Sequence, residues 1–266
     1  MPLAPTPNPK PEQTAVVTGA TGPLGTALSE LLIGTGFHVV GVARDRARLA
    51  VMAEDLGPRF RPAIADPADP VAAGEAIDRY RPAVTVLTAS ARALPRTLAR
   101  HTWETFTATW DVDVRQMFNW TGEALKAELL PGSTLIGVSS SVALTGAPLS
   151  VGFASAKAAI PMMARFAAAE AERSGLQIRF LAALPGLIHE TPRAAAVASA
   201  YEALRRSSSR PAAVPTAPAT GLVTATAAAE QIVEMALNPQ LASGSSYLLT
   251  ADGLRDVAPA EASASV

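Results

Sequence analysis

The chain has 266 residues, of which 49% are hydrophobic and 17% are charged, and its 22 basic and 23 acidic side chains give a formal net charge of −1. A charge so close to zero provides no general field for attracting nucleic acid or an anionic membrane, so neither is expected as a partner. The absence of cysteine excludes disulfides and thiolate chemistry, and the three histidines lack metal-ligand spacing, so no metal site is expected.

Both ends of the chain have the composition of tails. Residues 1–12 contain five prolines and no apolar stretch, which is typical of an extended segment and not of a signal peptide. Residues 257–266 are small and polar and are expected to be loose. No run of about 18 apolar residues predicts a membrane span. We therefore expect one domain over residues 13–256, located in the reducing cytoplasm.

Short apolar strands alternate with longer helical stretches along this domain. Strands are expected at Thr14–Thr18, His38–Ala43, 82–87, 133–139, 177–182 and 247–250. Helices are expected at 23–33, where leucines recur at helical spacing, and at Arg46–Leu56. The alternation predicts right-handed crossovers, and hence an α/β fold with a single doubly wound parallel sheet of Rossmann type covered by helices on both faces.

One segment, 190–226, departs from this rhythm, because it is rich in alanine, proline and serine and follows a strand end. Segments of this kind at the carboxyl edge of a parallel sheet are often lids over a ligand. A surface loop is the alternative, and the sequence does not choose between the two.

The segment TGATGPLG at 18–25 connects the first strand to the first helix. Glycines there let the backbone turn sharply and approach a pyrophosphate, which the N–H groups of the helix N-terminus can bind. Pro23 is tolerated in a first helical turn but removes one of these N–H groups. Arg44 stands at the end of the second strand, where an acidic side chain would bind a ribose 2′-hydroxyl, so it favours NADP(H) over NAD(H).

Together with further motifs, this turn resembles the short-chain dehydrogenase/reductase family over residues 14–253. The motifs are Asp66, which corresponds to an acidic residue against the adenine, the serines at 139–141, Lys157, the Pro-Gly pair at 185–186 and Ala-Asp-Gly at 251–253. The resemblance implies a nicotinamide cofactor bound by Gly19, Thr21, Gly22, Leu24, Gly25, Arg44, Asp66, Ala89, Lys157, Pro185, Gly186, Ile188 and Thr191.

The catalytic positions that the resemblance implies are only partly kept. The family uses a tyrosine as general acid and base, a lysine four residues later and a serine thirteen residues earlier. Ser140 and Lys157 match, but Phe153 occupies the tyrosine position and has no proton to exchange. An asparagine of the family aligns with Asp113.

Two more segments depart from the family pattern. The family's N-N-A-G stretch is replaced by Thr-Ala-Ser-Ala at 88–91. The threonine that contacts the carboxamide is shifted to Thr191, with Glu190 in its expected place. These departures fall on working positions while the scaffold stays recognisable, so we expect an altered function.

The first functional hypothesis is an oxidoreductase with an atypical active site. Hydride transfer requires mainly that donor and acceptor lie close together, so an activated C=N or a conjugated C=C or C=O acceptor can be reduced without a phenol. In this hypothesis Lys157 binds the ribose and Ser140 orients the substrate. Asp113 pairs with Lys157 and takes part in a proton relay.

Two alternatives remain open at this stage. In the first, a non-redox enzyme cyclises, isomerises or dehydrates a biosynthetic intermediate, with His189, Glu190 or Tyr201 as acid or base; the ordinary interpretation is that these are solvated or packing residues of the lid. In the second, the chain is a catalytically silent partner of an active relative.

A homodimer or homotetramer is expected from the resemblance, through helices near 102–128 and 153–174. Their apolar residues are Trp103, Trp110, Trp120, Phe153, Ala156, Ala159 and Met163, which suit a core as well as an interface.

Overall fold

The computed structural model describes residues 13–188, 191–208 and 222–257. The strands are β1 (Thr14–Thr18), β2 (His38–Ala43), β3 (Phe60–Ile64), β4 (Val84–Leu87), β5 (Thr134–Val138), β6 (Arg179–Pro185), β7 (Leu187–Ile188), β8 (Leu222–Val223), β9 (Ser246–Thr250) and β10 (Gly253–Asp256). The α-helices are α1 (Pro23–Gly34), α2 (Arg46–Leu56), α3 (Pro70–Tyr80), α4 (Trp103–Thr107), α5 (Arg115–Lys126), α6 (Val142–Thr145), α7 (Val151–Arg173), α8 (Pro192–Ser207) and α9 (Ala225–Leu237). Short 3₁₀ turns, η1 (Gly57–Arg59) and η2 (Leu98–Arg100), and a π-turn, η3 (Trp110–Val114), complete the described chain.

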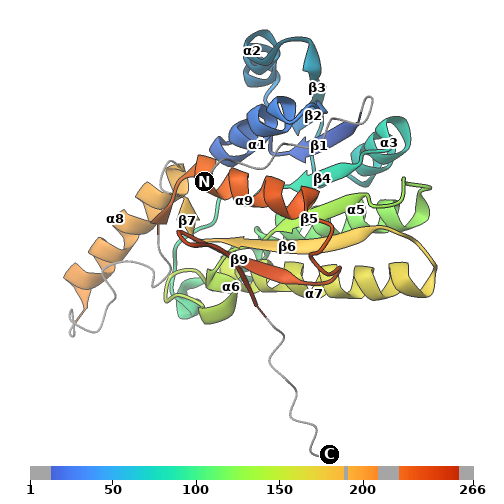
Figure 1. Ribbon diagram of the computed structural model, residues 1–266. Helices are drawn as coiled ribbons and strands as arrows, with labels where there is room; N and C mark the ends of the chain where they lie inside the picture. Colours follow the sequence, from blue (N-terminus) through green and yellow to red (C-terminus); the bar gives the residue numbers. More distant parts are fainter. Residues whose placement is uncertain (1–12, 189–190, 209–221, 258–266) are drawn as a thin grey trace, which may run out of the picture.

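Eight of these strands form one sheet in the order β10-β9-β6-β5-β4-β1-β2-β3. Neighbouring strands from β3 to β9 run parallel, and the edge strand β10 pairs antiparallel with β9. The strand order reverses between β1 and β4, and ligands of such sheets bind in the crevice outside the carboxyl ends at that point. The predicted doubly wound α/β fold is confirmed, with β3 and the antiparallel β10 added to it (Figure 1).

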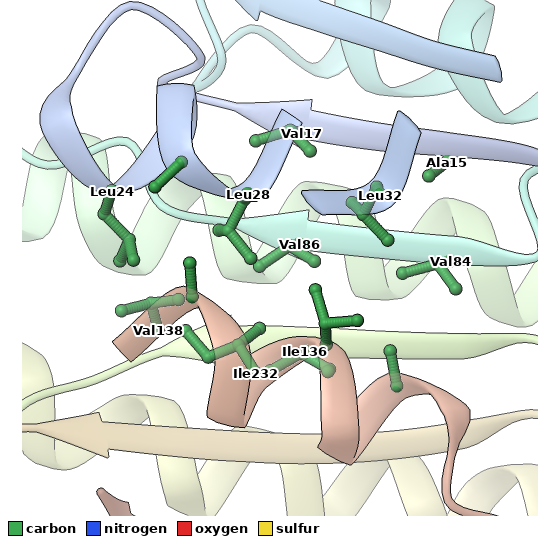
Figure 2. Close-up of a cluster of buried hydrophobic side chains, with 14 of the residues drawn as sticks. Ala15, Val17, Leu24, Leu28, Leu32, Val84, Val86, Ile136, Val138 and Ile232 are labelled. Atoms are coloured by element: carbon green, nitrogen blue, oxygen red, sulfur yellow. The ribbon is translucent and has the colours of Figure 1, made fainter. Parts of the chain in front are cut away.

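Side chains that alternate along each strand divide the core between the two faces of the sheet. Ala15 and Val17 of β1 belong to one buried cluster and Val16 to the other, as the period of two in a strand requires. Helices α1 and α9 cover the first face, where Figure 2 shows Leu24, Leu28, Leu32 and Ile232 against residues of β1, β4 and β5. Helices α3, α5 and α7 cover the other face.

The described part of the segment 190–226 contains a helix and a short strand. Helix α8 begins at Pro192, and Thr191 caps it by accepting a hydrogen bond from the N–H of Ala194 at 3.3 Å. The short strand β8 pairs with β7 in parallel. Alanine has the highest helix propensity, so the alanine-rich stretch that follows Thr191 forms a helix although prolines and serines lie nearby in the sequence. Within the described residues, no helix is long and apolar enough to cross a bilayer.

Candidate active site

The glycine turn places the first turn of α1 against the carboxyl end of β1. Gly19 has a positive φ of 63°, which a glycine adopts without strain. A Cβ on Gly25 would overlap the carbonyl oxygen of Gly19, so only glycine lets α1 pack this close to the turn. The N-cap Gly22 supplies no side-chain hydrogen bond, so the N–H groups of the first turn, except the one that Pro23 lacks, remain for an anion. These features fit a dinucleotide pyrophosphate.

The chain after β4 forms the wall beside this turn, and hydrogen bonds from distant residues hold it. The Thr18 hydroxyl donates to Oε1 of Gln116 at 2.6 Å and accepts from the N–H of Thr88 at 3.1 Å. Nε2 of Gln116 donates to the carbonyl oxygen of Ala89 at 2.8 Å. The Cα of Ala89 would lie 2.8 Å from a Cβ on Gly19, so the two backbones are in direct contact. Gln116 has no motif around it, so nothing in the sequence marks it as part of the site.

Two predicted cofactor residues lie exposed at the ends of β2 and β3. Arg44 is exposed, and the next residue, Asp45, caps α2 by accepting from the N–H of Arg48 at 3.0 Å. Asp66 is exposed, and its carboxylate accepts from the N–H of Ala68 at 2.9 Å. Both side chains are therefore open to a ligand on the β2–β3 side of the switch point.

Lys157 projects from α7 into the core and is 3% exposed. Its ammonium donates to the carbonyl oxygen of Val138 at 2.8 Å and lies 2.7 Å from Oδ2 of Asp113. It also lies 5.5 Å from the centre of the Phe153 ring, which offers it an apolar face and no hydrogen bond. The pairing of Asp113 with Lys157 is as predicted; the proton relay that the prediction attached to it stays a prediction.

Asp113 is fully buried and lies in the π-turn η3, just before α5. Besides Lys157, its carboxylate accepts from the Ser90 hydroxyl at 2.7 Å and from the N–H of Ala91 at 2.9 Å. A buried carboxylate is tolerated when it is both charge-paired and hydrogen-bonded, as here. Ser90, which is exposed, was not singled out by the sequence because an isolated serine in a loop carries no signal.

Pro161 lies inside α7 without breaking the helix. A proline has no N–H to offer the carbonyl four residues earlier, which here is that of Lys157. The Ser139 hydroxyl donates to this carbonyl oxygen at 2.6 Å and so replaces the missing helical bond. The main chain and the side chain of Lys157 are therefore both fixed from the end of β5.

The other catalytic candidates surround this network. Ser140 follows Ser139 and is 8% exposed. The Phe153 side chain is 4% exposed and packs with Val142, Ala154, Ala93 and Ala147. An ion pair joins Lys157 to Asp113 and a hydrogen bond joins it to Ser139, and Ser140 is the next residue in the chain after Ser139.

Of the predicted lid residues, the structure describes Tyr201, which packs in a separate buried cluster. Tyr201 is 2% exposed on α8 and packs against Leu149 and Val197. Burial raises the pKa of its phenol, with a smaller opposing effect from the backbone of Leu149. His189 and Glu190 lie outside the described residues. Tyr201 is therefore a packing residue of α8 in this structure, and its acid–base role stays a prediction.

The nicotinamide side of the predicted pocket follows β6. Pro185 and Gly186 are buried, and Ile188 is half-buried on β7. The Thr191 hydroxyl donates to the carbonyl oxygen of Ile188 at 2.7 Å and also caps α8, so it fixes the entry to that helix.

Two cavities differ sharply in size and place. A cavity of about 10 Å³ lies between the chain after β4 and α8, lined by Ala93, Pro95, Leu149, Ser150, Ala196 and Val197. A groove of about 920 Å³ lies between α7 and the strands β9 and β10, and it contains none of the predicted site residues. The candidate site is assigned from its hydrogen-bonded residues and from the strand order, because the volume of a groove does not by itself indicate a reaction. Among the described residues, no group of three or more potential ligands could hold a metal.

The chain is similar to known reductases. Residues 13–202 match the short chain dehydrogenase family. A 3-oxoacyl-[acyl-carrier-protein] reductase FabG from Rickettsia felis is 26% identical over 178 residues, which are 66% of this chain and 73% of the relative.

Solved structures share the fold. A 3-ketoacyl-(acyl-carrier-protein) reductase from Brucella melitensis, complexed with NADH, has a TM-score of 0.73 and 20% identity, over 89% of this chain and 96% of that one. A short-chain dehydrogenase/reductase from the same organism has a TM-score of 0.72 and 22% identity, over 89% and 94%. With its family match, its doubly wound sheet and its glycine turn, the chain belongs to the short-chain dehydrogenase family of oxidoreductases.

Proposed function

We propose that this chain is a reductase that prefers NADP(H) to NAD(H) and acts on an activated C=N bond or a conjugated C=C or C=O bond. The observation that carries the proposal is a contrast within one site. The glycine turn packs closely against α1 and against Ala89 of its wall, while the position of the proton donor is filled by the buried, apolar Phe153. Acceptors of these kinds are electrophilic without strong protonation, so they suit a site without a phenol.

In this proposal main-chain N–H groups and exposed side chains bind the dinucleotide part of the cofactor. The first-turn N–H groups of α1 bind the pyrophosphate, Arg44 binds the 2′-phosphate and Asp66 faces the adenine. Thr21 and Gly22, both half-exposed, border the same turn. An ammonium has three N–H donors, and within the described residues Lys157 uses two of them, on Val138 and Asp113, which leaves one for a ribose hydroxyl.

The nicotinamide cofactor, when bound, supplies the hydride. The chain contributes orientation: Ser140 hydrogen-bonds the acceptor, and Phe153 presents an apolar wall to it. Ala89, Pro185, Gly186, Ile188 and Thr191 border the remaining pocket. The acceptor receives hydride at carbon, and its nitrogen, oxygen or α-carbon takes a proton from water. On this mechanism a 3-oxoacyl thioester, the substrate class in the Rickettsia relative's name, is a poor substrate, because a ketone needs a stronger proton donor.

A cofactor titration tests the proposal. We expect wild-type protein to bind NADPH more tightly than NADH, with Arg44→Ala weakening NADPH binding about 10- to 100-fold and leaving NADH binding unchanged, since a charge-assisted phosphate contact is lost. Arg255→Ala, on the exposed edge strand β10, is the matched control and leaves both affinities unchanged. Absence of NADPH binding at millimolar concentration would remove the proposal.

The non-redox and silent alternatives lack a specific observation in their favour. The acid–base group of the first would have to come from the lid, where Tyr201 is buried against Leu149. They stay hypotheses.

We further propose that the chain forms a homodimer or homotetramer through the outer faces of α5 and α7. Phe118 of α5 and Phe166 of α7 are 68% and 67% exposed. Trp120 and Phe153, which the sequence also offered for an interface, are buried in the core. Phe166→Glu is expected to lower the mass measured by sedimentation, whereas Val51→Glu on α2, equally a change at an exposed apolar residue, leaves it unchanged. A wild-type monomer contradicts this expectation.

A further inference from the structure

Lys157 and Asp113 form a buried ion pair, and no other charged side chain among the described residues is in contact with it. Both side chains are almost inaccessible, at 4% and 0% exposed, and Nζ and Oδ2 are 2.7 Å apart. Phe153, one helical turn before Lys157, brings an aromatic ring in place of a polar group. Leaving either charge alone in such a position is strongly unfavourable, so each residue requires the other.

Asp113 also extends this unit to the chain that follows β4. Its two carboxylate oxygens accept hydrogen bonds from the Ser90 hydroxyl and the Ala91 N–H. The residue before these, Ala89, touches the backbone of Gly19 in the glycine turn. An unbroken series of contacts therefore runs from Lys157 through Asp113 and residues 89–91 to the turn.

Besides Thr18, which accepts from the N–H of Ala89 at 3.4 Å, two side chains from one helical region hold this stretch of chain. Gln116 of α5 holds the carbonyl oxygen of Ala89, and Asp113 holds residues 90 and 91. Of these two side chains, only that of Asp113 carries charge, and hydrogen bonds to a charged group are stronger than neutral ones.

We propose that Asp113 is a positioning residue: through its pair with Lys157 and its hold on residues 90–91, it fixes the wall of the dinucleotide site beside Gly19. Asp113 thereby controls cofactor affinity without touching the cofactor. The statement about affinity rests on the proposed function, whereas the statement about residues 89–91 does not.

Hydrogen exchange at the Ala91 amide tests the hold directly. We expect exchange at least about 10-fold faster in Asp113→Asn, because a neutral amide is a weaker acceptor and forms no ion pair with Lys157. The double variant Lys157→Met/Asp113→Leu leaves no unpaired buried charge, so it is expected to fold. Its Ala91 amide has lost the carboxylate acceptor and is also expected to exchange faster than in wild type. The control is Asp111→Asn, two residues away, where the carboxylate pairs at the surface with Arg115. It leaves exchange unchanged.

NADPH affinity, followed by nucleotide fluorescence in the same variants, is the second measurement. A dissociation constant about 10-fold higher in Asp113→Asn, with Asp111→Asn equal to wild type, supports the proposal. Wild-type exchange at Ala91 in both Asp113 variants overturns it, and so does faster exchange without any change in affinity. If wild-type protein binds no NADPH, the proposed function fails, and the exchange comparison still decides whether Asp113 holds the segment.

Discussion

Gly25→Ala is expected to lower the free energy of unfolding by about 3 kcal/mol, the upper end of the usual range for overpacking, and to abolish dinucleotide binding. An alanine Cβ would overlap the carbonyl oxygen of Gly19 and lie 2.7 Å from the Cα of Ala20. Both are backbone atoms of the turn, so no side-chain rotation relieves the overlap and α1 must move away from β1. Urea unfolding and an NADPH titration measure the two effects.

Gly122→Ala in α5 is the matched control. A Cβ at Gly122 meets no atom within 4 Å, and alanine is favoured over glycine in a helix by about 0.5–1 kcal/mol. This variant is therefore expected to be slightly more stable than wild type. If Gly25→Ala were as stable as wild type, the close approach of α1 to the turn would not hold.

The parts of the fold that the sequence predicts best are those encoded by neighbouring residues. β1 and β2 have the bounds expected from their β-branched runs, and α2 begins and ends as predicted. β6 was expected at 177–182 and occupies Arg179–Pro185, because its end is set by pairing with β5 and β9. Local patterns place an element, and its partners in the sheet fix its length.

The site is predictable only where a charge or a motif marks it. The exchange of an expected asparagine for Asp113 suggested the ion pair with Lys157, and the two side chains meet. Thr18 and Gln116, by contrast, are 98 positions apart, and no charge or spacing links them. Such contacts follow from strand order and helix packing, which exist only in the folded chain.

Pro161 is a residue whose local effect is offset by a contact that the sequence does not reveal. Within a helix, a proline costs about 3 kcal/mol, so from sequence it predicts a break or a kink. The helix α7 nevertheless continues through it, because the Ser139 hydroxyl satisfies the Lys157 carbonyl that the proline leaves free. That partner belongs to the end of β5, so only the tertiary structure relates the two residues.

Restoring a phenol at position 153 is expected to give this protein ketone reduction, but only when Asp113 is changed as well. Phe153→Tyr alone adds a proton donor beside an ammonium whose charge Asp113 already offsets at 2.7 Å. In Phe153→Tyr/Asp113→Asn the new phenol replaces Asp113 as the partner of that ammonium, whose charge lowers the pKa of the phenol and brings its proton transfer closer to neutral pH. We expect kcat for a 3-oxoacyl thioester about 10²- to 10⁴-fold above wild type in the double variant, the usual range for general acid catalysis.

Saturating NADPH in this assay separates the catalytic gain from the weaker cofactor binding expected of Asp113→Asn. A general acid works while protonated, so kcat of both phenol variants falls as the pH rises through the pKa of the phenol, and it falls at lower pH in the double variant. Asp113→Asn alone is the control and gains no ketone reduction, because Phe153 still provides no proton. Equal gains in the single and double variants would show that Asp113 does not offset the charge of Lys157 at this site, and the ion pair would then matter for structure alone.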